Sequence, residues 1–144
     1  MWNDLSVEDA VARYRAASEA NEIEGLLATL TPDAELVSPI SAHVVFRGTN
    51  DLRVLLSAVY GSFGSLKWHS EVGEGSTRVV LGDATLGPLT ISDAMVFELA
   101  PDGRIRKIRP HLRPWLALTL FALVLFPKIA RHPGVVLRSF RNGR

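Results

Sequence analysis

One ten-residue segment, Thr90–Leu99, constrains the fold of this chain more than any other. Because strand side chains alternate between two faces, a single face of this segment carries Ile91, Asp93, Met95, Phe97 and Leu99. Four of these five side chains are large and apolar, and a turn signal follows at 100–103. The pattern predicts a β-strand with one face in the core.

A carboxylate, Asp93, interrupts the apolar face of this predicted strand. An unpaired buried carboxylate costs several kcal/mol, and it usually responds by raising its pKa. One interpretation is an acid that lines an apolar pocket. The alternative is a structural aspartate with satisfied hydrogen bonds, or a strand register that turns the side chain outward.

Charge is distributed unevenly along the 144 residues, a length that predicts one domain with a sizeable core. All 15 acidic residues lie within 1–102, which has a net charge of −9. The segment 103–144 holds ten basic residues and no acidic one. Such asymmetry is typical of a segment that meets an anionic partner, or of one that folds back on an acidic body.

The sequence offers few ligands for a metal or a cofactor. It has no cysteine, no His-Glu-x-x-His motif and no closely spaced histidines, so neither a metal site nor a cofactor is expected. The lack of cysteine also fits a reducing compartment. The N-terminal stretch is acidic and has no apolar core, so we expect no signal peptide and predict a cytoplasmic protein.

Helical periodicity dominates the first part of the chain. Ser6–Asp9 resembles a capping box, and apolar residues then recur at helical spacing to about Asn21. Tyr14 lies on the apolar face of this helix, where its hydroxyl needs a partner; an ordinary core tyrosine is the alternative. A short helix is predicted around 23–30. A third follows Gly48 and has an apolar face made of Leu52, Leu55, Leu56, Val59 and Tyr60.

Strand patterns follow up to Leu112. Strands are predicted over 34–39, 66–72, 77–81, 90–99 and after Gly103, while 42–46 is either a partner strand or a covering loop. Ile105 and Ile108 are three residues apart, which predicts a β-bulge. This order predicts an α+β fold in which three N-terminal helices pack on a curved antiparallel sheet. Tyr14 and Asp93 are expected to face a cavity between the two layers.

Five segments carry a resemblance to a known family. They are Val11–Tyr14, Thr31–Pro39, Phe46–Gly48, Ile91–Phe97 and Pro101–Ile105. With them the chain resembles the NTF2-like superfamily, the α+β cone of ketosteroid isomerase and the SnoaL-like polyketide cyclases. The resemblance covers roughly 6–112, so we expect an NTF2-like domain over 1–112 and a helical extension over 113–144. These motifs specify the fold better than the activity, because this fold hosts many chemistries.

The resemblance implies roles for three residues. Tyr14 matches the isomerase tyrosine that donates to the steroid carbonyl oxygen, and Asp93 matches the neutral acid beside it. Where the isomerases carry a general-base aspartate before the strand-ending proline, this chain has Ser38. A hydroxyl without an activating base cannot take a proton from carbon as a carboxylate can.

A substitute base would be a histidine, because imidazole titrates near neutrality. Of His43, His69 and His111, we take His111 as the first candidate for a catalytic residue, although strand alternation from Ile108 turns it away from the pocket. The residues expected to bind substrate are Ser38, Trp68, Met95, Phe97 and Ile108.

The resemblance, together with these residues, implies a pocket for a hydrophobic carbonyl or polycyclic compound. An enzyme of this kind would be an isomerase or a cyclase. The alternative is a non-catalytic module that binds a ligand or docks on a membrane. A base within reach of Tyr14 and Asp93 distinguishes the two.

The extension begins with an almost wholly apolar stretch, 115–126, in which only Thr119 is polar. A helix of twelve residues spans about 18 Å, short of the ~30 Å hydrocarbon core of a membrane. Three interpretations stay open: packing on the domain, a homodimer contact, and a peripheral anchor on anionic lipid. The basic residues available to such an anchor are Lys128, Arg131, Arg138, Arg141 and Arg144. Nucleic acid is not expected, because stacking aromatics are lacking.

Overall fold

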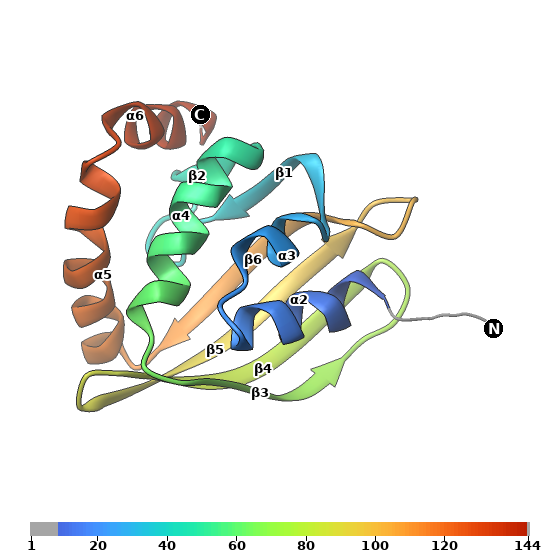
Figure 1. The fold of residues 1–144 in the computed structure, drawn as a ribbon, viewed down its shortest axis with the longest axis horizontal. Helices are drawn as coiled ribbons and strands as arrows, with labels where there is room; N and C mark the ends of the chain where they lie inside the picture. The colour runs from blue at the N-terminus through green and yellow to red at the C-terminus, as the bar shows by residue number, and fades with distance from the viewer. Residues whose placement is uncertain (1–8, 144) are drawn as a thin grey trace.

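A six-stranded sheet curves around three helices in the computed structural model, which describes residues 9–143 (Figure 1). The helices are α2 (Ala10–Glu19), α3 (Ile23–Leu27), α4 (Thr49–Ser62), α5 (Trp115–Ala130) and α6 (Pro133–Asn142). The strands are β1 (Leu30–Val37), β2 (Val45–Arg47), β3 (Leu66–Val72), β4 (Thr77–Leu86), β5 (Leu89–Leu99) and β6 (Ile105–Arg113). The predicted α+β class is confirmed.

The strand order is β2-β1-β6-β5-β4-β3, and one pair departs from the predicted antiparallel sheet. β1 pairs with β6 in parallel, while the other neighbours pair antiparallel. A parallel pair needs a long crossover connection, and α4 with β3–β5 supplies it here. Local periodicity cannot reveal this pairing, because the two strands are far apart in the sequence.

Several element boundaries follow from local chemistry. Asp9 is the N-cap of α2, and its Oδ1 atom accepts a hydrogen bond from the N–H of Ala12 at 2.9 Å. The capping box predicted from Ser6 lies outside the described residues. Leu30 belongs to β1 rather than to the short helix, and residues 45–47 form the partner strand β2 rather than a covering loop.

The predicted bulge in the last strand is confirmed. Glu98 pairs with Lys107, but the next residue, Leu99, pairs with Ile105, so one residue of β6 is left over between them. Because of this extra residue, Ile105 and Ile108 are both fully buried although they are three apart.

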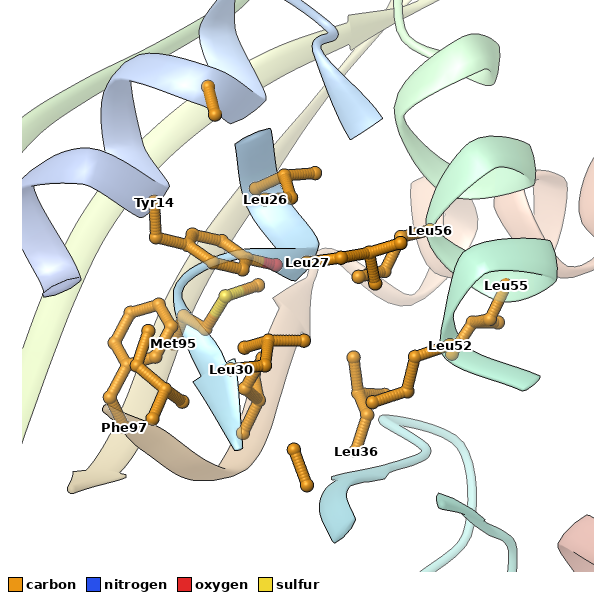
Figure 2. Close-up of a cluster of buried hydrophobic side chains, with 14 of the residues drawn as sticks. Tyr14, Leu26, Leu27, Leu30, Leu36, Leu52, Leu55, Leu56, Met95 and Phe97 are labelled. Carbon is orange, nitrogen blue, oxygen red and sulfur yellow. The ribbon is translucent and has the colours of Figure 1, made fainter. Parts of the chain in front are cut away.

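The main core lies between the concave face of the sheet and the helices α2, α3 and α4. Figure 2 shows side chains from all three helices meeting those of β1 and β5. The ring of Tyr14 extends from α2 past Phe97 and Met95, and its hydroxyl points toward α4 (Figure 2). Leu26, Leu52 and Leu56 are almost completely buried in this cluster.

The C-terminal extension packs on the domain. α5 runs along one end of the sheet beside α4, and α6 turns across its top next to β2 (Figure 1). Its buried side chains join the core: Ala117, Phe121, Ile129 and Val135. Packing on the domain, the first of the three predicted interpretations, is therefore present in the structure.

Polar contacts also join the extension to the body. Arg138 donates from Nε and Nη2 to the two carboxylate oxygens of buried Asp51 in α4, at 2.9 and 2.8 Å. Lys128 donates to the hydroxyl of Ser62 at 2.8 Å. Arg138 thus folds back on the acidic body, which is one of the two possibilities that the uneven charge distribution left open.

Among residues 9–143, no single helix is long and apolar enough to cross a membrane. α5 and α6 together have the necessary length and composition, but they meet at a bend of 116°.

Candidate functional site

A cavity of about 600 Å³ lies between the curved sheet, α4 and the two C-terminal helices. Its lining from the sheet and the β1–β2 connection includes Leu36, Ser38, Ile40, Phe46, Trp68, Ala84, Ile91, Asp93, Met95, Pro110 and Leu112. Its lining from the helices includes Leu55, Leu56, Val59, Tyr60, Phe121, Leu123, Leu125, Phe126, Ile129, Val136 and Phe140. Cavities of this size accommodate drug-sized ligands.

The polar groups in this lining are few. Among the described residues that line the cavity, Tyr60 and Asp93 are the only side chains that can titrate. Trp68 directs its Nε1–H away to the hydroxyl of Ser18, at 2.8 Å. The other polar side chains in this mainly apolar lining are three serines, Ser38, Ser41 and Ser139.

Asp93 is positioned by the middle of the sheet. It pairs with Gly82 of β4 on one side and with Leu112 of β6 on the other. Its Oδ1 atom is buried and has no hydrogen-bond partner among the described residues. Burial raises the pKa of Asp93 to about 7, although the backbone N–H of His111 opposes the rise. Asp93 therefore lies in the lining of this cavity with a raised pKa.

Two buried tyrosines are within electrostatic range of this acid. The hydroxyl oxygens of Tyr14 and Tyr60 are 2.7 Å apart. Burial raises the pKa of both phenols well above the usual value, and the charge of Asp93 acts in the same direction. Both tyrosines are therefore neutral over the physiological range.

Tyr14 does not line the cavity, and its hydrogen bond to Tyr60 is what connects it to a lining residue. It is fully buried and is absent from the lining, whereas Tyr60 is a lining residue. The ring of Phe97 packs edge-on against Tyr14, with centroids 5.0 Å apart and an interplanar angle of 67°. Phe97 therefore supports Tyr14 from the core side (Figure 2).

The structure brings some of the predicted site residues together and not others. Ser38, Trp68, Asp93 and Met95 line the cavity, while Phe97 and Ile108 are fully buried in the core beside it. Ile108 shares a strand face with Pro110 and Leu112, which line the cavity, but it pairs with Phe97 further along β6, where core side chains pack against the sheet.

His111 lies on the opposite face of the sheet from the cavity. It pairs with Ala94 and is exposed, and its Nδ1 atom lies 3.1 Å from the Ala94 carbonyl oxygen. Neighbouring Pro110 pairs with Met95, and both line the cavity, so alternation turns His111 outward. His43, His69 and His132 are also exposed and absent from the lining, so none of the histidines within residues 9–143 lines the cavity.

Sequence reasoning missed two parts of this site. Tyr60 lies on the apolar face of α4, and the criterion that singled out Tyr14 applies equally to it. No comparable sequence pattern indicated that the cavity is also lined by Phe121, Leu123, Phe126 and Phe140. A helix that is apolar all round does not reveal which face it buries.

No family model matches the chain, and no curated protein matches its sequence. Solved structures do match it. An uncharacterized protein with a cystatin-like fold from Silicibacter pomeroyi has a TM-score of 0.83 and 15% identity, over 95% of both chains. A steroid delta-isomerase from Pseudomonas aeruginosa has a TM-score of 0.77 and 21% identity, over 87% of this chain and 92% of that chain. An NTF2-like protein of unknown function from Cytophaga hutchinsonii has a TM-score of 0.65 and 15% identity, over 82% of this chain and 99% of that chain.

Other similar structures are described as SnoaL-like and NTF2-like proteins. The chain therefore has the NTF2-like cone fold that the sequence motifs predicted. At these identities the likeness shows the fold alone, because one fold carries many different sites.

Proposed function

We propose that the protein binds a hydrophobic small molecule in this cavity and holds a carbonyl oxygen of that molecule at Asp93 and Tyr60. The carboxyl group of Asp93 carries the proposal, because its Oδ1 atom is buried without a partner in a mainly apolar lining. A buried polar atom without a hydrogen bond is unfavourable, so a ligand that supplies the bond gains affinity and orientation.

The protonation state of Asp93 suits an acceptor oxygen. With a pKa of about 7, about half of the molecules carry the neutral acid at pH 7. The neutral acid has an O–H that donates, whereas the carboxylate only accepts. A carbonyl ligand therefore favours the protonated form.

Tyr60 supplies a second donor. The pair Tyr14–Tyr60 has two hydroxyl hydrogens but only one mutual hydrogen bond. Tyr14 is enclosed in the core, so the arrangement that uses both hydrogens has Tyr14 donating to Tyr60. The hydrogen of Tyr60 is then free to donate to a ligand in the cavity.

Titration with prodan, a fluorescent naphthyl ketone, tests the proposal, because prodan emission reports both an apolar site and a hydrogen bond at the carbonyl. We expect Asp93→Leu to weaken binding at least tenfold, and Asp93→Asn to bind within about threefold of the wild type, since the amide still donates. Binding by the wild type should also weaken as the pH rises through 7.

His111→Gln is the matched control, because His111 is exposed on the opposite face of the same strand pair. It should bind prodan as the wild type does. If Asp93→Leu binds prodan with unchanged affinity and emission, Asp93 does not hold the carbonyl and the proposal fails.

An isomerase- or cyclase-like reaction on such a ligand is the second candidate function, and the likeness to a steroid delta-isomerase favours it. Proton abstraction from the carbon beside the carbonyl would fall to ionised Asp93, with Tyr60 donating to the developing oxyanion. Deuterium exchange at that carbon, followed by NMR, checks this. Exchange that is catalysed by the wild type and lost in Asp93→Asn would support catalysis.

A further inference from the structure

The outward face of α5 has no charged residue. Its exposed positions recur every three or four residues along the 16-residue helix: Trp115, Leu116, Thr119, Leu123, Phe126, Pro127 and Ala130. The only polar side chain among them, Thr119, turns its hydroxyl back to the carbonyl of Trp115 at 2.7 Å. A helix with water on its outer side normally carries charged residues there.

α6 continues this apolar surface through Leu137 and Phe140, which are 70% and 54% exposed. Six of the eight large hydrophobic side chains that are exposed among residues 9–143 belong to α5 and α6. We call the exposed apolar residues of these two helices the α5–α6 patch. Apolar residues concentrated in this way mark an interaction surface.

The cavity opens through the α5–α6 patch. Leu123, Phe126 and Phe140 line the cavity and are 67%, 65% and 54% exposed. Ile40, in the connection between β1 and β2, also lines the cavity and is 60% exposed. The rim of the cavity is therefore itself apolar, so a lipophilic ligand crosses little polar surface on entry.

The charge around the patch is positive. The segment 114–144, which includes α5 and α6, contains five basic residues and no acidic one. Arg131 follows α5 directly, Arg141 lies in the last turn of α6, and both are exposed. This charge complements an anionic surface. It opposes the pairing of this face with a second copy of itself, because a two-fold interface brings equal charges together.

We propose that the α5–α6 patch lies on the surface of an anionic lipid bilayer, and that the cavity exchanges its lipophilic ligand with that bilayer. α5 is about 24 Å long and is apolar outward along its whole length, which suits a helix lying in the interface rather than across it. The ligand-exchange part rests on the proposed function, whereas the docking part does not.

Flotation of the full chain with phosphatidylcholine vesicles, with and without about 30% phosphatidylserine to give the surface a negative potential, tests the docking. We expect binding to the anionic vesicles that weakens as salt rises. Leu116→Glu with Leu137→Glu should reduce binding at least tenfold, because both side chains are exposed and neither lines the cavity. Arg131→Gln and Arg141→Gln should each reduce it about fivefold.

Val72→Glu is the matched control, since Val72 is a hydrophobic residue of β3, 56% exposed, outside the patch. It should float as the wild type does. If the wild type does not float, or if Val72→Glu loses binding as the double variant does, the docking fails. A dimer in gel filtration that the double variant dissociates would also overturn it, because the patch would then belong to a second copy.

Prodan separates the two proposals. The double variant should bind prodan in vesicle-free solution as the wild type does, but should take it from anionic vesicles at least tenfold more slowly. If neither the wild type nor the double variant binds prodan in solution, the proposed function is contradicted. The flotation result alone then decides the docking proposal. Equal transfer rates for both proteins would overturn the exchange part.

Discussion

The hydroxyl oxygens of Tyr14 and Tyr60 lie 2.7 Å apart and join α2 to α4 at a point where only Tyr60 reaches the cavity. The two phenols therefore have different tasks, although they share one hydrogen bond. Tyr60 is the member of the pair that lines the cavity, whereas Tyr14 is bonded to Tyr60 and packs against Phe97.

Tyr14→Phe should lower the free energy of unfolding by about 1 kcal/mol, the net value of a buried hydrogen bond. It should weaken prodan binding less than Tyr60→Phe does, because it removes no atom from the cavity lining. Urea unfolding and prodan titration of the two variants check this. A larger loss of binding in Tyr14→Phe than in Tyr60→Phe would show that Tyr14 contacts the ligand directly.

The raised pKa of Asp93 makes stability depend on pH with a definite sign. The folded protein keeps the proton up to about pH 7, whereas the unfolded chain releases it near the ordinary value of 3.8. Between these values the folded state binds more protons, so the free energy of unfolding falls as the pH rises. Above pH 7 this contribution is fully lost and the curve levels.

Asp93→Asn removes this dependence and is the variant to compare. The free energy of unfolding of Asp93→Asn should equal that of the wild type below about pH 4. Its excess over the wild type should grow between about pH 4 and 7 and reach a few kcal/mol above pH 7. Urea unfolding at five pH values between about 4 and 8 measures it. A constant difference at all these pH values would mean that Asp93 titrates normally and is not held in an apolar site.

Ser38 lines the cavity, and it is the residue that the sequence resemblance matches to the general base of the isomerases. Its Oγ atom accepts a hydrogen bond from the N–H of Ile40 at 3.1 Å, and none of its described contacts is with a carboxylate or an imidazole. We therefore expect the wild type to isomerise a Δ5-3-ketosteroid only slowly. Ser38→Asp should raise the rate by about 100-fold or more if Asp93 and Tyr60 stabilise the oxyanion. Rapid turnover by the wild type would show that another base acts.

The sequence predicted those features that depend on local periodicity. The alternation in 90–99 placed Asp93 among apolar neighbours, and the three-residue spacing of Ile105 and Ile108 located the bulge. Tyr14 was placed correctly on the buried face of its helix, but the prediction that it faces the cavity was wrong, because only Tyr60 of the pair lines it. The link from Tyr14 to Tyr60 depends on how α2 packs against α4. Nothing in one helix specifies that packing.

The parts that could not be predicted depend on long-range contacts. The parallel pairing of β1 with β6 joins segments about 70 residues apart. The pair Arg138–Asp51 spans 87 residues, and neither residue stands out in its own segment. The uniformly apolar sequence of α5 predicted that this helix packs against another surface, but not which of its faces does so. The part of the cavity wall that the helices form was therefore missed.

Deletion of 114–144 tests whether the two C-terminal helices are part of the core. It removes Phe121 and Ile129, which are only 3% and 6% exposed, and it leaves buried Asp51 without Arg138. Burial of each large apolar side chain is worth about 1.5–3 kcal/mol, so the truncated chain should unfold at a much lower urea concentration or fail to fold. The full-length Leu116→Glu, Leu137→Glu variant is the control and should keep wild-type stability within about 0.5 kcal/mol, since it changes only exposed positions. A truncated chain as stable as the full one would show that α5 and α6 cover the cavity without stabilising the fold.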